Sequence, residues 1–236
     1  MGKRYIDLSL PIETAGQFSM VPRNEIWGQE EVDTSIVSIS RPGEWPMHKF
    51  EMSTESYTHV HVPANLYKDG WTNEKVPTNM FFGEAVVFDM SHKQELEPVT
   101  AADLETAGIE VKPGDMAIVR TDWSDKHWGS AKFWAEMPYL AEDGCDWLLE
   151  RGIKAYVSDT YNDLPLAKHC DACGRLEPTN LGSPTHYKFL KSDVILVEYV
   201  TNLGALQRSR VELVCLPLKL SGVGQSPARV VAIEDE

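Results

Sequence analysis

Short apolar runs rich in β-branched residues recur along the whole chain. Runs of this kind, bounded by polar or glycine-containing segments, are typical of buried β-strands. We therefore expect strands at residues 34–39, 83–88, 116–120, 154–157, 194–200, 211–220 and 228–233.

Helical patterns fall between these strands. Residues 100–107 begin with Thr100, a favourable N-cap residue, and carry acidic side chains in the first turn. Residues 142–151 are followed by Gly152, a typical helix stop. Because strands outnumber helices and no repeat or linker interrupts the chain, the pattern predicts a strand-rich α/β protein with a single domain over residues 1–236.

Composition restricts the partners. A formal net charge of −14 argues against nucleic acid, because binding to the phosphate backbone requires a basic surface. No run of about 18 apolar residues and no signal-peptide pattern is present, so we expect no membrane association and a cytoplasmic location. Four cysteines are too few for a disulfide scaffold, and we interpret Cys170 and Cys173 as an ordinary loop rather than a zinc or redox pair.

The candidate chemistry begins in residues 50–67. Glu55, His59 and His61 are separated by even numbers of residues, so an extended backbone would place all three side chains on one face. Two imidazoles and a carboxylate form a common ligand set for zinc, manganese or iron. Pro63 would then end the strand. The alternative is that the two histidines merely decorate a half-exposed strand.

A second histidine and carboxylate lie downstream. Glu198 interrupts the apolar run 194–200, twelve residues after His186, and burying an unpaired charge there would be costly without a metal or cationic partner. The alternative is an edge strand from which Glu198 faces water. Asp159 follows the predicted strand 154–157, a common place for functional groups, although a loop aspartate or a helix N-cap is the alternative.

Two well-known catalytic motifs are absent, and three tryptophans are possible substrate contacts. The chain has no glycine-rich phosphate loop and no Gly-x-Ser-x-Gly elbow, which excludes nucleotide-dependent and ordinary serine-hydrolase chemistry. Trp27, Trp45 and Trp71 flank the histidine segment and could stack on an aromatic substrate, or pack in the core or an interface.

The histidine segment resembles the signature of the cyclase family of metal-dependent hydrolases, which includes kynurenine formamidases and isatin hydrolase. Thr58, His59 and Pro63 match in register the family pattern His-x-Gly-Thr-His-x-Asp-x-Pro-x-His. His186 and Glu198 have the spacing of the downstream histidine and glutamate of that family. Residues 114–123, 155–165, 200–206 and 217–233 resemble further family segments in the same order.

This resemblance implies a swivelling β/β/α fold, assembled as a homodimer or homotetramer. It also implies one or two bound divalent cations and a small-molecule substrate, often aromatic, whose amide, formamide or lactam bond is hydrolysed.

The chain differs from the family signature at four positions. Glu55 replaces the first histidine, Tyr57 the glycine, His61 the aspartate and Asn65 the last histidine. The exchanges at 55 and 61 preserve two imidazoles and one carboxylate, but a neutral imidazole has one available lone pair and cannot bridge two cations. We therefore expect one divalent ion per chain, Mn or Zn. The predicted ligands are Glu55, His59, His61, His186 and Glu198.

Asn65 occupies the position of the histidine that shuttles a proton in the family mechanism. An amide cannot do so at neutral pH. The candidate catalytic positions are therefore Asn65, Glu198 and Asp159, with Glu198, Asp159 or His48 as replacement proton carriers.

Three functions are consistent with these residues. The first is a metal-dependent hydrolase that opens a small cyclic amide, lactone or formamide with activated water. The second is a lyase or isomerase acting through a cation-stabilised enolate. The third is a family member that has lost catalysis and binds only a metal or small ligand, as the Asn65 replacement would permit.

Overall fold

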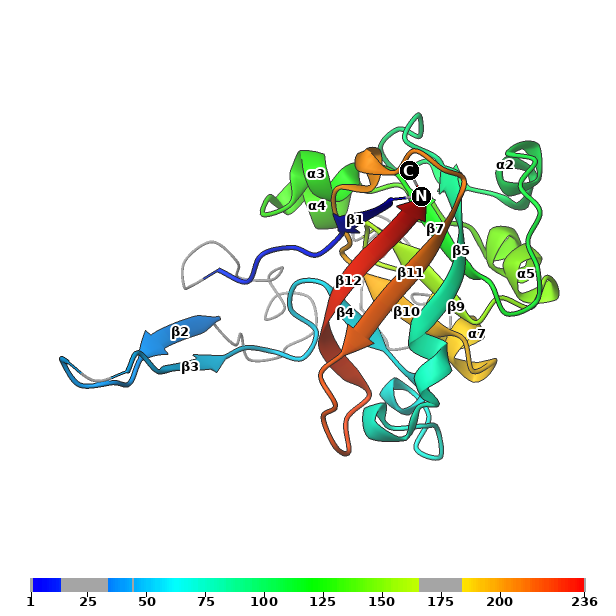
Figure 1. Ribbon diagram of the computed structural model, residues 1–236. Coiled ribbons are helices and arrows are strands. Elements are labelled where there is room, and N and C mark those ends of the chain that lie inside the picture. Colours follow the sequence, from blue (N-terminus) through cyan, green and yellow to red (C-terminus); the bar gives the residue numbers. More distant parts are fainter. Residues whose placement is uncertain (1, 14–33, 44, 166–183, 236) are drawn as a thin grey trace.

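A single large sheet organises the protein. The computed structural model describes residues 2–13, 34–43, 45–165 and 184–235. Within these residues eight strands join one sheet (Figure 1). Their order is β1 (Lys3–Asp7), β12 (Gln225–Asp235), β11 (Arg210–Pro217), β5 (Phe82–Asp89), β7 (Met116–Arg120), β9 (Ala155–Ser158), β10 (Ile195–Glu198) and β4 (His59–His61).

The sheet closes into a barrel because β12 is long enough to pair with two strands along one edge. Its first part pairs antiparallel with β4, so that Gln225 faces His61. Its second part pairs antiparallel with β1, so that Lys3 faces Asp235. Since β4 also pairs with β10, strands from both ends of the chain are joined in one closed set of hydrogen bonds.

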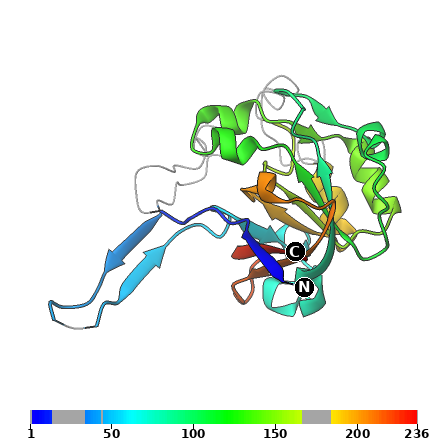
Figure 2. The same ribbon diagram turned by 45° about the horizontal axis from the view of Figure 1, so that its top comes forward.

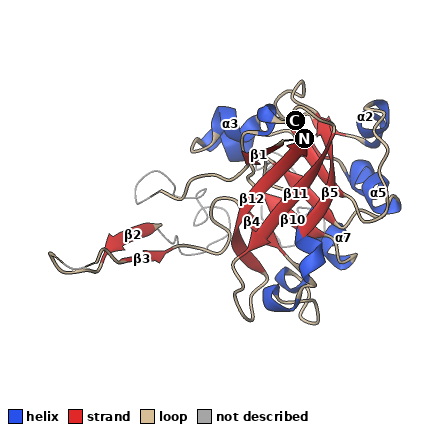
Figure 3. Ribbon diagram, viewed as in Figure 1, coloured by secondary structure: helices blue, strands red, loops and turns tan. Residues whose placement is uncertain are grey.

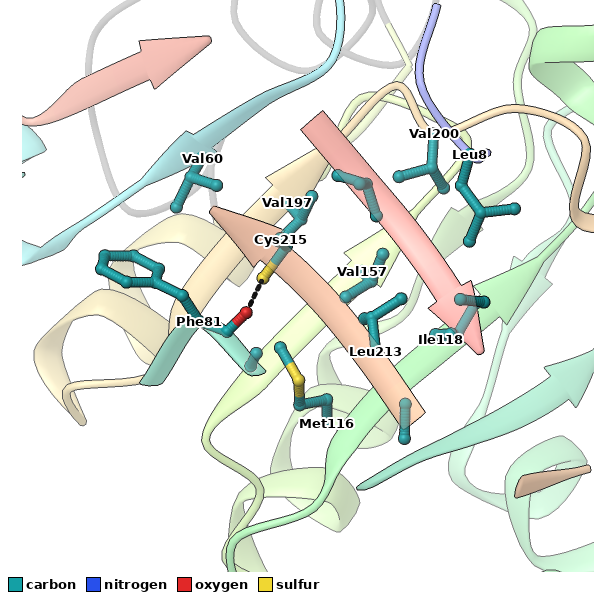
Figure 4. Close-up of a cluster of buried hydrophobic side chains, with 14 of the residues drawn as sticks. Leu8, Val60, Phe81, Met116, Ile118, Val157, Val197, Val200, Leu213 and Cys215 are labelled. Carbon is teal, nitrogen blue, oxygen red and sulfur yellow. Dashed lines mark hydrogen bonds between the residues drawn. The ribbon is translucent and has the colours of Figure 1, made fainter. Parts of the chain in front are cut away.

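Alternation along each strand divides the core into two layers. On β5, Ala85 and Val87 pack inside the barrel, whereas Val86 and Phe88 pack outside it. Figure 4 shows the inner layer, where the Cys215 thiol donates a hydrogen bond to the carbonyl oxygen of Phe81 at 3.2 Å. The inside of the barrel is therefore filled with side chains and leaves its outer face for the functional groups.

Helices cover part of the outer face (Figures 1 and 3). Three of them, α2 (Ala101–Thr106), α5 (Glu142–Glu150) and α7 (Pro184–Lys191), pack over the outer apolar layer. The helices α3 (Trp123–His127) and α4 (Ala131–Ala135) contribute to a separate aromatic cluster. The remaining elements are β2 (Ser35–Ser38), β3 (His48–Glu51), β6 (Pro98–Val99), β8 (Tyr139–Leu140), η1 (Pro63–Asn65), η2 (Asn73–Lys75), η3 (Thr78–Phe81) and η4 (Leu203–Ala205).

The predicted strand-rich α/β fold is confirmed. Each predicted strand is present, with bounds that shift by a few residues, and both predicted helices form. Thr100 caps α2 in a reciprocal capping box with Asp103, and Gly152 follows α5 with φ of 72°. The pattern missed β1 and β3, whose sequences KRYID and HKFE are mostly polar, and the helices α3, α4 and α7.

The expectation of an extended backbone from Glu55 to His61 is wrong. Residues 54–58 form turns and bends, and β4 begins only at His59. Tyr57 adopts a left-handed conformation with φ of 56°, which redirects the chain immediately before the strand. His59 and His61 therefore share a face of the sheet, and Glu55 does not belong to that strand. Pro63 does follow the end of β4, where it starts η1.

Two further expectations concern location and cysteines. Among the described helices, none has the length and apolar character needed to cross a bilayer; the cytoplasmic location stays a prediction. Cys145 and Cys215 are free and buried, while Cys170 and Cys173 lie outside the described residues.

Candidate metal centre

Strand register brings the two histidines and the glutamate together. In the antiparallel pairing of β10 with β4, Glu198 lies opposite His59 and Leu196 opposite His61. Val60 points into the barrel, so its neighbours His59 and His61 point to the outer face, where Leu196 belongs to the outer apolar layer. Glu198, two residues after Leu196, points the same way.

The three side chains converge on one point. Nε2 of His59 and Nε2 of His61 are 2.6 Å apart, and Oε2 of Glu198 lies 3.5 Å and 3.6 Å from them, respectively. One ligand atom from each residue lies within 4.8 Å of the other two, and all three residues are buried. Both alternatives, a half-exposed histidine strand and a water-facing Glu198 on an edge strand, are therefore wrong.

The backbone orients His59. Its Nδ1 lies 2.8 Å from the carbonyl oxygen of Tyr57, which can only accept, so Nδ1 carries the proton and the Nε2 lone pair faces Glu198. Burial and the neighbouring His61 lower the pKa of His59 to about 4, although Glu198 acts in the opposite direction. The ring is thus neutral at neutral pH and presents a free nitrogen, as a metal ligand must.

Glu198 is held as a carboxylate. Burial raises its pKa, but the interactions with His61, His186 and His59 outweigh burial and lower the pKa to about 2. Its Oε1 also accepts a hydrogen bond from the backbone N–H of Asn162 at 3.0 Å. Neutral His59 and an ionised carboxylate give this pair of groups a negative charge that favours a cation.

His186 approaches the second oxygen of Glu198 from α7. Its Nε2 lies 3.5 Å from Oε1 of Glu198, and its Nδ1 lies 2.5 Å from Oδ2 of Asp163. Burial lowers the pKa of His186, but Asp163 and then Glu198 outweigh this and raise it to about 9. Asp163 was not predicted from the sequence, although it lies in the segment 155–165 that resembles the family.

Glu55 and Asn65 lie on the opposite side of His61 and are joined through Gln225. Nδ2 of Asn65 is 2.8 Å from Nδ1 of His61. Gln225 Nε2 donates to Oε1 of Glu55 at 2.8 Å and to Oδ1 of Asn65. The structure thus places Asn65 against a proposed ligand and leaves Glu55 outside the three-residue group. Gln225 was also missed by sequence reasoning.

Asp159 is not brought into this group. Both of its oxygens accept from the backbone N–H of Thr121, one accepts from the Thr121 hydroxyl, and the other accepts from the N–H of Trp123 at 2.9 Å. Its carboxyl group therefore joins the end of β9 to the start of α3. Asp159 is thus neither the loop aspartate nor the helix N-cap of the alternatives, because it is buried and the N-cap position of α3 is Asp122.

The other candidates lie elsewhere. His48 is exposed on β3, in the hairpin that stands off the barrel (Figure 2). Trp45 is exposed in the same hairpin, Trp71 packs against the inner core, and Trp27 lies outside the described residues.

A different aromatic cluster borders the centre. The Tyr199 ring lies 5.0 Å from that of His59, and Tyr161 lies 5.9 Å from His186. Trp128 is 5.3 Å from Tyr199, and Trp134 is 6.2 Å from Tyr161. Tyr199, like Tyr57, has a left-handed backbone with φ of 57°. The aromatic side chains beside the metal centre thus come from α3, α4 and strand ends rather than from the tryptophans that flank the histidine segment.

The donor set fits a divalent cation. Two imidazole nitrogens and a carboxylate oxygen converge in a buried position, and the ring nitrogen of His59 that faces away donates to a backbone acceptor, which leaves its Nε2 unprotonated. At His61 the Asn65 amide donates to Nδ1, so this ring would bind a cation through Nε2 only on losing the proton that Nε2 carries. Ligands of this kind suit zinc, manganese and other divalent transition metals.

The chain belongs to the Cyclase family, whose sequence model matches residues 6–162. A kynurenine formamidase from Salinibacter ruber is 24% identical over 220 residues, which cover 90% of this chain and 93% of that protein. A kynurenine formamidase from Bacillus anthracis is 25% identical over 232 residues, covering 97% and 96% of the two chains.

Solved structures share the fold. Isatin hydrolase A from Labrenzia aggregata, bound to benzyl benzoate, superposes with a TM-score of 0.84 at 22% identity and covers 99% of this chain and 94% of its own. A structure described as a potential metal-dependent hydrolase with cyclase activity has a TM-score of 0.72 at 21% identity and full coverage of both chains. The swivelling fold expected from the family resemblance is thereby confirmed.

Asp159 generates a prediction about pH and stability. Burial raises its pKa to about 7 from an ordinary 3.8, against the hydrogen bonds from Thr121 and Trp123. A pKa raised on folding contributes stability that is complete below about pH 3.8 and is lost as pH rises towards 7, at roughly 1.4 kcal/mol per pH unit. An asparagine side chain cannot ionise, so the variant Asp159→Asn lacks this pH dependence. Between pH 4 and pH 7 the free energy of unfolding of the wild type should therefore fall by a few kcal/mol relative to that of the variant.

Urea unfolding at a series of pH values measures this shift. Asp69→Asn, at an exposed site, serves as the control and should leave the pH dependence unchanged. Parallel stability curves for the wild type and Asp159→Asn would contradict the assignment.

Proposed function

We propose that this protein is a metal-dependent hydrolase that cleaves the C–N bond of a small formamide or cyclic amide, or the C–O bond of a lactone. The observation that carries this proposal is the buried convergence of His59, His61 and Glu198 in a chain of the Cyclase family. The relatives named kynurenine formamidase and isatin hydrolase support the bond type.

The proposed centre holds one divalent cation per chain, manganese or zinc. His59, His61 and Glu198 are its ligands, and His186 and Glu55 remain the proposed additional ones. When bound, the cation supplies Lewis acidity, which activates water and polarises a carbonyl group.

The residues of the chain supply orientation and charge. Tyr57 fixes the ring of His59 through its carbonyl oxygen, and the N–H of Asn162 fixes Glu198. Asp163 pairs with His186 and so keeps a second histidine directed at the same carboxylate. Of the proposed replacement proton carriers for the family histidine at Asn65, Asp159 is engaged by Thr121 and Trp123 and His48 lies on the exposed hairpin, so Glu198 is the one that lies at the centre.

The aromatic cluster supports an aryl substrate. Tyr199, Trp128, Trp134 and Tyr161 form a continuous series of ring contacts that begins at His59 and returns to His186. Aromatic rings stack favourably on one another, and the relatives are named for aromatic compounds. The rings proposed to contact such a substrate are Trp128 and Tyr161, which are partly exposed, because Tyr199 and Trp134 are buried in the cluster itself. We also propose that the protein is a homodimer or homotetramer.

Removal of a ligand tests the metal centre. His59→Ala and Glu198→Gln should each lower metal content from about one ion per chain towards zero. They should also lower turnover by more than about 10–100-fold, the loss that is typical when a residue that only hydrogen-bonds to a metal ligand is removed. Elemental analysis of protein purified without added metal measures the first effect. His92→Ala, at an exposed histidine, should change neither. Two ions per chain, or full activity in both site variants, would contradict the mononuclear centre.

The reaction class is tested by the product. With formylkynurenine and isatin as probes, we expect each product to be heavier than its substrate by one water for an opened ring, or to appear as amine plus formate for a formamide. A chelator should abolish turnover, and added manganese or zinc should restore it. A product with the mass of the substrate would indicate an isomerase, and metal binding without turnover of any amide or lactone would indicate a binding protein.

A further inference from the structure

Two tyrosines with a left-handed backbone border the candidate metal centre. Tyr57 has φ of 56° and Tyr199 has φ of 57°. This region is unfavourable for a side chain as large as tyrosine, and glycine or asparagine usually occupies it. Both tyrosines are buried, so neither forms a relaxed surface turn. Backbone strain of this kind persists only where the surrounding structure holds it, and it concentrates at functional sites.

The two tyrosines lie on either side of the pair formed by His59 and Glu198. Tyr57 precedes His59 by two residues, and Tyr199 directly follows Glu198. In the pairing of β4 with β10, His59 lies opposite Glu198. The chain therefore turns through a left-handed residue just before β4 begins, and again just after β10 ends, at the same end of this strand pair.

Thr58 connects the two turns. It follows Tyr57 in the chain, it is buried, and its hydroxyl donates a hydrogen bond to the carbonyl oxygen of Tyr199 at 2.7 Å. The same hydroxyl oxygen accepts a hydrogen bond from the N–H of Leu10 at 2.9 Å. One side chain thus joins the segment after β1, the start of β4 and the end of β10.

The hydrogen bond acts on a group whose direction depends on the strained conformation. The direction of a carbonyl group follows from the φ and ψ of its own residue, so a bond anchored on β4 holds Tyr199 in the left-handed region. If Tyr199 relaxed to a negative φ, its carbonyl oxygen would leave Thr58. Its ring, now 5.0 Å from that of His59, would move as well. The adjoining Glu198 would then lose the fixed backbone that directs its carboxylate.

The carbonyl oxygen of Tyr57 completes the arrangement. It accepts the hydrogen bond from Nδ1 of His59 at 2.8 Å, and the Tyr57 hydroxyl donates to the carbonyl oxygen of Glu13 at 3.0 Å. The backbone of Tyr57 therefore orients one proposed ligand, and that of Tyr199 supports the other. Thr58 is the residue that contacts both turns, through its peptide bond to Tyr57 and its hydroxyl to Tyr199.

We propose that Thr58 is a positioning residue, whose hydroxyl holds the left-handed turn at Tyr199 and thereby fixes both the Glu198 carboxylate and the packing of the Tyr199 ring on His59. The part of this inference that concerns metal affinity rests on the proposed function. The part that concerns the His59 ring does not.

Thr58→Val tests the role of the hydroxyl, because it keeps the size and the branched shape of the side chain. We expect about 10–100-fold weaker binding of Mn²⁺ or Zn²⁺, measured in competition with a chromophoric chelator, as is typical when a group that supports a metal ligand is lost. At saturating metal, kcat should fall by a similar factor and KM should stay nearly constant, because the hydroxyl does not touch the substrate. Thr58→Ser, which retains a hydroxyl, should recover most of both.

Thr100→Val is the matched control. It removes the hydroxyl that caps α2, so it should lower the melting temperature while metal affinity and kcat stay at their wild-type values. A loss of metal affinity of the same size in Thr58→Val and Thr100→Val would assign the effect to general destabilisation and would overturn the positioning role.

A second measurement needs no metal. In metal-free protein labelled with ¹³C-histidine, the ring C–H resonances of His59 report the position of the neighbouring Tyr199 ring, since an aromatic ring shifts the resonances of nuclei beside it. Thr58→Val should displace these resonances more than those of the exposed His92. Thr58→Ala, whose smaller side chain fits the same space, should have the same effect and replaces Thr58→Val if that variant does not fold.

The two measurements separate this inference from the proposed function. Absence of metal binding in the wild type, with His59 resonances that still respond to loss of the Thr58 hydroxyl, would refute the metal centre and support the positioning role. Unchanged His59 resonances in a folded variant without this hydroxyl would overturn that role, whatever the metal result.

Discussion

The pairing of a buried carboxylate with three imidazoles is the interaction on which the functional part of the fold depends. Glu198 lies in a strand with neighbours on both sides, where an unpaired charge would be strongly unfavourable. One of its oxygens faces His59 and His61, and the other faces His186 and the N–H of Asn162. A slip of one residue between β10 and β4 would turn these histidines into the apolar interior. The centre therefore forms only in the strand register that the barrel has.

Those parts of the site that follow from local pattern could be predicted. The two-residue spacing of His59 and His61 does place them on one face, and the apolar run around Glu198 does form an interior strand. Glu55 failed the same argument because Tyr57 adopts a left-handed conformation, which its residue type does not indicate. Gln225 could not be found locally, since its contact with Asn65 arises from pairing between segments 160 residues apart.

Asp159 and Asp163 show how far a functional residue can be predicted from its position after a strand. Both follow β9 within a few residues, and both are buried. Asp159 is engaged by Thr121 and Trp123 and fixes a turn, whereas Asp163 lies against His186. The sequence identifies the neighbourhood, but only the path of the loop decides which carboxylate meets the histidine. The three residues that differ from the family signature at 55, 61 and 65 are likewise connected to one another. The Gln225 amide donates to Glu55 and to Asn65, and Asn65 contacts His61.

The shared edge of β12 has a consequence for how the chain is connected. Because Lys3 pairs with Asp235, the two ends of the polypeptide lie side by side on neighbouring strands (Figure 1). Ends in this arrangement can be linked and the backbone opened elsewhere, as in circular permutation. An opening at Pro42 and Gly43 would leave every barrel pairing intact. The spatial order of the strands therefore matters more to this fold than the order in which they follow one another along the chain.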